Sequence, residues 1–270
     1  MAISSELHQH ILEWLEVAAE NLRQSLKRNL VVDEKTNASD LVTEMDKATE
    51  AFFIEKIKAY YPEHRVIGEE GMGAGAADLS GMVWVIDPID GTLNFVKQKN
   101  NFGILIGLYQ DGKPVAGYIY DVMKHDVYWG IVGQGAYLNG EVLQPIDIPR
   151  LQDSIAVGNV AMFTMNRCNS QRLLENVLGV RAHGSAALET IEVIRGEASV
   201  YLSFMLSPWD FAAGWAICES LGFKVTKPNG DPISILEKSP IIMARPAIHA
   251  EVVRVLAEQK KELGDINEYA

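Results

Sequence analysis

The chain has 270 residues, 48% of them hydrophobic, which is enough for one large domain or two modest ones. A net charge of −12 argues against a nucleic acid or an anionic membrane as partner, so any anionic substrate would be held by metal ions or backbone amides. We expect no signal peptide and no transmembrane helix, and the two cysteines, Cys168 and Cys218, have no metal-ligand spacing and suit a reducing cytoplasm.

The first half of the chain predicts two helices and a run of adjacent antiparallel strands. Apolar residues at helical spacing predict a long helix over 7–26, and Thr43-Glu44-Met45-Asp46 has the capping-box pattern of a second helix that runs to about residue 60. Between these helices, the polar segment 29–39 predicts a loop or a loose hairpin. The expected strands are 64–68, 84–86, 102–109, 114–120 and 127–132, with hairpin signals at 111–112 and 139–140.

The second half alternates strand and helix, which is typical of an α/β unit. Its expected strands are 155–158, 180–183, 198–202, 223–226 and 241–244. Its expected helices are 171–178, 184–195, 208–221 and 247–261. The stretch 145–153 is the expected domain boundary. We therefore predict an N-terminal α+β domain with an antiparallel sheet over 1–148 and a C-terminal α/β domain over 149–270.

The chain is organised around the stretch from Trp84 to Phe95. An apolar strand ends at Asp87, Pro88 is expected to stop that strand, and a turn signal at Asp90-Gly91 precedes the start of a short helix. The two carboxylates would face the mouth of the sheet, where the free N–H groups of the new helix also point. Negative charge beside an anion-binding nest predicts Mg²⁺ bound by the carboxylates and a phosphate bound by the amides.

Three further acids stand at the ends of expected elements. Glu69 follows a strand, Asp210 begins a helix, and Asp46 lies in the first turn of another. Taken singly, each acid is better explained without a function: Glu69 as a solvated loop acid, Asp210 as an acid favoured by the helix dipole, and Asp46 as the capping partner of Thr43. Converging carboxylates about 4 Å apart would repel by about 4 kcal/mol at an effective dielectric near 20, so a cluster of them needs cations.

Five motifs in one order connect these acids. They are Asp40-Leu41-Val42-Thr43-Glu44-Met45-Asp46, Gly68-Glu69-Glu70, Trp84 through Phe95, Gly184-Ser185-Ala186-Ala187, and Trp209-Asp210-Phe211-Ala212-Ala213-Gly214. In these motifs the chain resembles the magnesium-dependent, lithium-sensitive inositol monophosphatase family, over roughly residues 35 to 222. The resemblance implies a layered αβαβα sandwich, a homodimer, and hydrolysis of phosphate monoesters in which magnesium-activated water attacks the phosphate in line.

The resemblance also implies a role for each matching position. Glu69, Asp87 and the carbonyl of Ile89 would hold one Mg²⁺, and Asp87, Asp90 and Asp210 would hold a second. Glu69 would help to hold a third, weaker ion. Thr92, paired with Asp46, would orient the attacking water and help to deprotonate it. The backbone of Gly91 and Thr92 would receive the phosphate.

The identity of the substrate is left open by one departure from the family pattern. Ser185 and Ala186 resemble the family's contacts to the hydroxyls of the alcohol, and Asp210 would also reach the ring. Inositol-selective members place a Glu where this chain has Ser203, which is shorter and neutral. An inositol phosphate is therefore one expectation, and a sugar bisphosphate or the 2′-phosphate of NADP is another; Ser203 is equally read as a passive strand residue.

Lys35 resembles a lysine of the family's third-metal region, although a solvated charge is the favoured interpretation. A phosphatase with an aspartyl nucleophile is disfavoured because that class needs D-x-D, whereas Asp87 and Asp90 are three residues apart. A metal-binding scaffold without activity is disfavoured because no alternating-acid calcium loop is present. An inactive relative is disfavoured because every implied metal ligand is intact.

Overall fold

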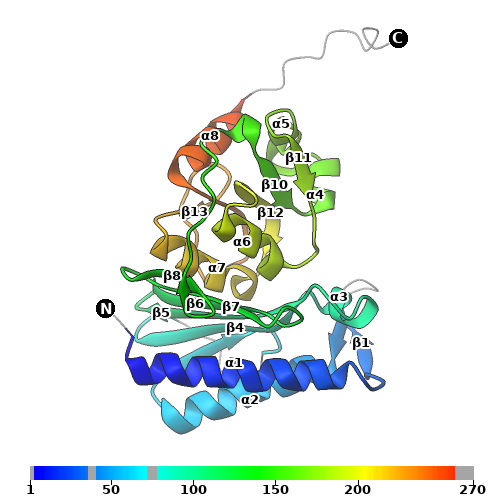
Figure 1. The fold of residues 1–270 in the computed structure, drawn as a ribbon, viewed down its shortest axis with the longest axis vertical. Coiled ribbons are helices and arrows are strands. Elements are labelled where there is room, and N and C mark those ends of the chain that lie inside the picture. The colour runs from blue at the N-terminus through cyan, green and yellow to red at the C-terminus, as the bar shows by residue number, and fades with distance from the viewer. Residues whose placement is uncertain (1–2, 36–40, 72–77, 259–270) are drawn as a thin grey trace.

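A computed structural model describes residues 3–35, 41–71 and 78–258. Helices and sheets alternate in five layers (Figure 1), which confirms the expected αβαβα sandwich. The helices α1 (Ser5–Ser25) and α2 (Glu44–Tyr60) form one outer layer, α6 (Ala186–Arg195) and α7 (Pro208–Ser220) lie between the two sheets, and α8 (Pro246–Ala257) covers the far side. Within the described residues, no helix is both long and apolar enough to cross a bilayer.

The larger sheet has seven strands, in sequence order, and carries most of the acids of interest. All neighbouring pairs are antiparallel except the first, β3 with β4, so the expected antiparallel run is confirmed. Its strands are β3 (Arg65–Gly68), β4 (Met82–Asp90), β5 (Gly103–Gln110), β6 (Lys113–Asp121), β7 (Asp126–Ile131), β8 (Gly135–Leu138) and β9 (Glu141–Val142).

The prediction that Pro88 stops the central strand is wrong, because β4 continues to Asp90. Asp87 pairs with Leu105 and Asp90 with Gly103, so the register shifts between the two pairs. Pro88 lies inside this irregular stretch, where its missing N–H removes no regular ladder bond. The irregularity turns both aspartates toward the same end of the sheet.

A small hairpin lies where the sequence predicted a loop or a loose hairpin. β1 (Val32–Glu34) pairs antiparallel with β2 (Leu41–Thr43), and α2 begins at the next residue. The predicted capping box is confirmed, since the Thr43 side chain accepts from the Met45 N–H and the Asp46 carboxylate accepts from the Thr43 N–H. Residues 36–39 of the predicted segment lie outside the described ranges, as does residue 40.

The smaller sheet has five strands in the order β11-β10-β12-β14-β13. They are β10 (Ile155–Gly158), β11 (Gly179–Arg181), β12 (Val200–Leu206), β13 (Lys224–Thr226) and β14 (Ser239–Ala244). The chain passes between the sheets through 143–154, which contains one 3₁₀ turn, η1 (Leu151–Asp153). The two halves share a core cluster around α6 and α7, and their division at residues 148 and 149 stays a prediction.

Two predictions for the second half need correction. The helix expected over 171–178 is only α5 (Gln171–Leu174), and α4 (Val160–Thr164), which was not predicted, precedes it with the 3₁₀ turn η2 (Arg167–Asn169) between them. Left-handed backbone at Asn166, Cys168 and Asn169 divides this region into short pieces. The last helix ends at Ala257, and the end of its predicted range, 259–261, lies outside the described residues.

α7 lies close to the larger sheet because two strand residues there are glycines. A Cβ on Gly107 would lie 2.9 Å from the Cβ of Ala212, and a Cβ on Gly117 would lie 3.1 Å from the Cβ of Ala216. The Tyr109 hydroxyl fixes the helix further by donating to the Ala212 carbonyl at 2.9 Å. These close contacts hold α7 against the sheet, so that its first turn, with Asp210, lies near the end of β4.

Candidate metal centre and active site

Three aspartates from distant parts of the chain meet at the end of β4. Asp87 and Asp90 come from β4 and Asp210 from the first turn of α7, and one carboxylate oxygen of each lies within 4.8 Å of the others. Asp87 is 2% exposed and Asp90 is 6% exposed. The convergence that the sequence predicted for these residues is therefore present, and an all-oxygen donor set of this kind fits Mg²⁺.

Asp90 also fixes the start of α6. Its carboxylate accepts from the Ala186 N–H at 3.1 Å, from the Ala187 N–H at 2.8 Å and from the hydroxyl of Ser185. A carboxylate offers about four acceptor positions, so one remains for a cation. Ser185 and Ala186 thus line the site, but the polar groups named here are directed at Asp90; their predicted contact with substrate stays a prediction.

Glu69 extends the acid cluster at the end of β3. Burial raises the pKa of Glu69, and the charge of Glu69 in turn raises the pKa of Asp87. The ammonium of Lys35 lies 2.9 Å from Glu69 and also pairs with Glu70. The Lys35 side chain is 24% exposed and ion-paired, so the favoured interpretation of a solvated charge does not describe it.

Thr92 opens the short helix α3 (Thr92–Lys97) immediately after Gly91. Its hydroxyl oxygen lies 3.0 Å from a carboxylate oxygen of Asp46 and 3.0 Å from the carbonyl of Ile89, and its single proton serves one of them at a time. Gly91 has φ +87, and an added Cβ would lie 3.2 Å from the Asn101 carbonyl, so the turn requires glycine. The predicted Thr92–Asp46 pair is thus present.

Asn94, which sequence reasoning did not single out, joins this corner to the second half of the chain. Its side-chain amide donates to the carbonyl of Asn101 at 2.9 Å and to that of His183 at 2.8 Å. His183 stands just before the turn that opens α6. The Asn94 amide therefore connects α3 to the loop before α6, the helix whose first N–H groups donate to Asp90. The position of Asn94 inside the Trp84 to Phe95 motif is the sequence feature that could have indicated this role.

Burial and mutual repulsion raise the pKa values of the acids. Burial raises the pKa of Asp87 well above its ordinary value, and the charges of Glu69, Asp90 and Asp210 add to this. Burial and the charge of Asp90 raise the pKa of Asp210 to about 8. Burial raises the pKa of Asp46 to about 6, although hydrogen bonds from Thr43 and Thr92 lower it. Without cations the cluster retains protons, so it is built for positive charge.

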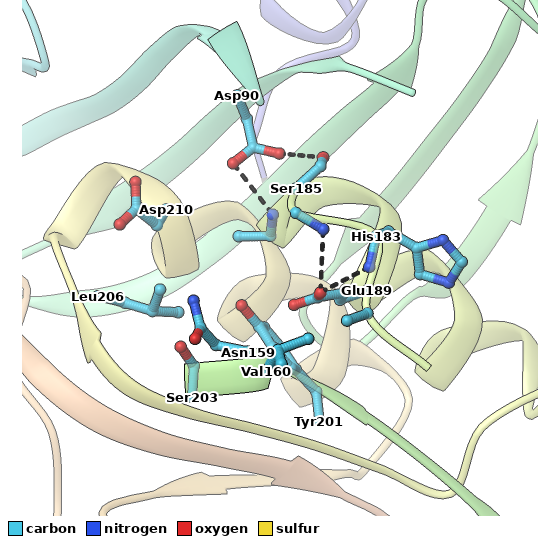
Figure 2. Close-up of a pocket in the computed structure, with 13 residues that line it drawn as sticks. Asp90, Asn159, Val160, His183, Ser185, Glu189, Tyr201, Ser203, Leu206 and Asp210 are labelled. Carbon is cyan, nitrogen blue, oxygen red and sulfur yellow. Dashed lines mark hydrogen bonds between the residues drawn. The ribbon is translucent and has the colours of Figure 1, made fainter. Parts of the chain in front are cut away.

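A pocket of about 500 Å³ opens beside the acids. Figure 2 shows Asp90 and Asp210 on one side of it and Asn159, Ser203 and Tyr201 across from them. Ser203, a residue of β12, is 5% exposed and lines the pocket. The position that departs from the inositol-selective pattern therefore faces this pocket.

Glu189 is a pocket residue that the sequence did not indicate. It is 4% exposed, and its carboxylate accepts from the His183 N–H at 3.0 Å and the Gly184 N–H at 3.4 Å (Figure 2). Burial raises its pKa to about 7, although these hydrogen bonds lower it. An acid within a predicted helix is usually assigned to the solvent face, and no motif distinguished this one.

A layered αβαβα fold with an acid-lined pocket is an arrangement that fits a metal-dependent hydrolase of phosphoric monoesters. A model of the inositol monophosphatase family matches residues 4–261. The inositol-1-monophosphatase of Bacillus subtilis (strain 168) is 38% identical over 95% of this chain and 98% of its own length. The chain belongs to the inositol monophosphatase family, as its motifs indicated.

Solved structures agree with this assignment. An IMPase/NADP phosphatase complexed with Mg²⁺ and phosphate superposes with a TM-score of 0.85 at 29% identity, covering 94% of this chain and 96% of that one. The 2′AMP-bound structure of SaIMPase-II superposes with a TM-score of 0.83 at 37% identity, covering 92% and 93% of the two chains.

Proposed function

We propose that the protein hydrolyses phosphate monoesters with two or three Mg²⁺ ions held at the end of β4. Glu69, Asp87 and the Ile89 carbonyl are assigned to one ion, and Asp87, Asp90 and Asp210 to a second. Glu69 also helps to hold a third, weaker ion. The observation that carries this proposal is the approach of three carboxylate oxygens to within 4.8 Å of one another in a buried corner.

The bound metal ions would supply Lewis-acid polarisation of the phosphate and a lower pKa for water. Asp46 and Thr92 then act on the proton of that water. The Asp46 carboxylate, fixed by two donors from Thr43, orients the Thr92 hydroxyl at 3.0 Å, and the pair accepts and holds the proton as water adds to phosphorus. The Gly91 and Thr92 backbone is assigned to the phosphate oxygens.

An inositol phosphate is the substrate that the family assignment favours, with Ser185, Ala186, Ser203 and Asp210 facing the alcohol. A phosphate on the ribose 2′-position, as in NADP, is the second candidate; a sugar bisphosphate is a third. Ser203 is the observation that supports the wider range, because its neutral side chain lines the pocket where inositol-selective relatives have an acid.

The remaining assignments follow the family and the composition. We assign a homodimer, inhibition by lithium, and a cytoplasmic location, which fits Cys168 and Cys218 as free thiols. A net charge of −12 fits a protein that binds neither nucleic acid nor anionic membrane.

Metal removal tests the proposal. Turnover of inositol 1-phosphate should vanish in EDTA and return with excess Mg²⁺, and Mg²⁺ should raise the melting temperature, since binding to the folded state stabilises it. Turnover that persists in chelator would contradict the metal mechanism. Stabilisation by Mg²⁺ without turnover of any monoester would instead support a metal-binding scaffold.

A further inference from the structure

Glu50 is a buried acid that lies outside the motifs and outside the set of assigned metal ligands. It stands on α2, in the outer helical layer (Figure 1), four residues after Asp46, and it is 0% exposed. Residues four apart share one face of a helix, so both acids belong to the buried face of α2. Because glutamate is rarely buried completely unless its carboxylate is paired, the groups that Glu50 contacts indicate its role.

The Glu50 carboxylate contacts the backbone on both sides of Glu69. After Glu69, the Glu70 N–H donates to one carboxylate oxygen of Glu50 at 2.7 Å. Before Glu69, the same carboxylate packs directly against the α-carbon of Gly68. A Cβ added to Gly68 would lie 2.5 Å from the carboxyl carbon of Glu50 and 2.7 Å from its second oxygen. Position 68 therefore requires glycine, because any side chain there would displace the carboxylate.

Glu69 itself is fixed to the neighbouring strand. β3 pairs with β4 in parallel, with Gly68 opposite Ile86, and the Glu69 N–H donates to the Ile86 carbonyl at 3.3 Å. Glu69 therefore leaves β3 beside Asp87, the acid with which it is assigned to share a Mg²⁺. The strand pairing places Glu69 at this corner, and Glu50 fixes the peptide group that follows it.

Lys35 also binds this turn, but in a different way. Its ammonium pairs with the carboxylates of Glu69 and Glu70, so it occupies the same oxygen atoms that a metal ion would use. The contacts of Glu50 are to backbone atoms of Gly68 and Glu70, and they do not compete with a metal ion for the Glu69 carboxylate. Glu50 can therefore hold the turn in the metal-bound protein as well.

We propose that Glu50 is a positioning residue that holds Glu69 where it binds Mg²⁺. A helix keeps residues one turn apart at a set spacing, so α2 also links this metal ligand to Asp46, whose carboxylate lies 3.0 Å from the Thr92 hydroxyl. One rigid helix thereby fixes both the ligand of the first ion and the group that accepts the proton of the attacking water. This inference rests on the proposed function, whose first ion it concerns.

Glu50→Asp tests this role, because the shorter side chain keeps a carboxylate but withdraws it from the Glu70 N–H. The apparent dissociation constant for Mg²⁺, measured without substrate from the dependence of the melting temperature on Mg²⁺ concentration, should rise about tenfold. The Mg²⁺ concentration for half-maximal turnover should rise in parallel, while KM for inositol 1-phosphate at saturating Mg²⁺ stays within about twofold. Glu55→Asp, the same change at an exposed position of α2, should match the wild type.

Gly68→Ala perturbs the same contact from the other side. The added methyl group should displace the Glu50 carboxylate and raise the apparent dissociation constant for Mg²⁺ to a similar extent. In the double variant with Glu50→Asp, the carboxylate is already withdrawn and leaves room for the methyl group. The double variant should therefore lie within about threefold of either single variant, whereas independent effects would multiply to about a hundredfold.

The remaining outcomes separate this inference from the proposed function. If Glu50→Asp and Gly68→Ala melt at lower temperature but bind Mg²⁺ as the wild type does, Glu50 is only a structural residue and the inference falls. Multiplying effects in the double variant would also overturn it. If Glu50→Asp does not fold, unchanged Mg²⁺ binding in Gly68→Ala is sufficient to reject the inference. A wild type that is neither stabilised by Mg²⁺ nor active would remove the proposed function and this inference together.

Discussion

The two walls of the pocket differ in how they are built. The metal wall, around Asp46, Asp87 and Asp90, is buried, and each acid accepts at least one hydrogen bond from a backbone N–H. The opposite wall combines two kinds of residue: Tyr201 and Ser203 of β12 are buried, whereas Asn159 and Val160, at the start of the five-residue helix α4, are exposed. The acids of the metal wall are thus held in place by backbone hydrogen bonds, whereas the opposite wall is buried only on its β12 side.

The largest expected effect on catalysis comes from removing one negative charge from the metal wall. Asp210→Asn keeps an oxygen to accept from the Ser207 N–H, now 2.8 Å away, but removes an anionic ligand. We expect kcat to fall by more than about 100-fold while circular dichroism is unchanged. Glu219→Gln, an exposed acid on the same helix, is the control. A near-normal kcat would remove Asp210 from the site.

Removing a hydroxyl from the same wall should have a somewhat smaller effect. Thr92→Val keeps the shape of the side chain but leaves Asp46 without the bonded hydroxyl. We expect a decrease in kcat of about 100-fold, in the range of general acid–base contributions, with an unchanged stabilisation by Mg²⁺ in a melting assay. Thr92→Ser should recover much of the rate. An equal loss in Thr92→Ser would show that packing, and not the hydroxyl, matters.

A change in the opposite wall should alter selectivity and little else. Ser203→Glu introduces an acceptor for ring hydroxyls and a charge that opposes a nucleotide. The ratio of kcat/KM for inositol 1-phosphate over 2′-AMP should rise about tenfold, the scale of one hydrogen bond to a charged group. Ser203→Gln separates size from charge. An unchanged ratio in both variants would show that Ser203 is a passive strand residue.

The smallest expected effect concerns the stability of the protein and its dependence on Glu189, a buried acid that lines the pocket. Because the folded-state pKa of Glu189 is about 7, above that of an exposed Glu, the folded protein binds this proton more tightly than the unfolded chain. Its contribution to stability is therefore present at low pH and declines as pH rises toward and through 7. Glu189→Gln should melt with the wild type at pH 5 and a few degrees higher at pH 8, on the order of 1–3 kcal/mol. A melting difference that is the same at both pH values would contradict the shift.

The metal wall was predictable because its residues stand at fixed places in local patterns. A strand end, a D-G turn and a capping box place Asp87, Asp90 and Asp46 from neighbouring residues alone. The path of the backbone at Pro88 was mispredicted, because whether a proline interrupts a sheet depends on the ladder of the neighbouring strand, which local sequence does not encode.

The opposite wall was not predictable in the same way. α4 has five residues, too few to display a helical period, and its start is signalled only by the Asn159 cap. The burial of Glu189 depends on Tyr201 and the loop before α6, which come together only in the folded chain.

The glycines beneath α7 have a consequence for how the centre keeps its dimensions. Gly107 and Gly117 are distant in sequence from the proposed metal ligands, yet they determine how closely α7, the helix that carries Asp210, approaches the larger sheet. Magnesium accepts oxygen ligands only within a narrow range of distances. A methyl group added at either glycine would push α7 away from the sheet and so move the Asp210 carboxylate relative to Asp87 and Asp90. The two glycines therefore determine the position of one proposed metal ligand without contacting the metal centre themselves.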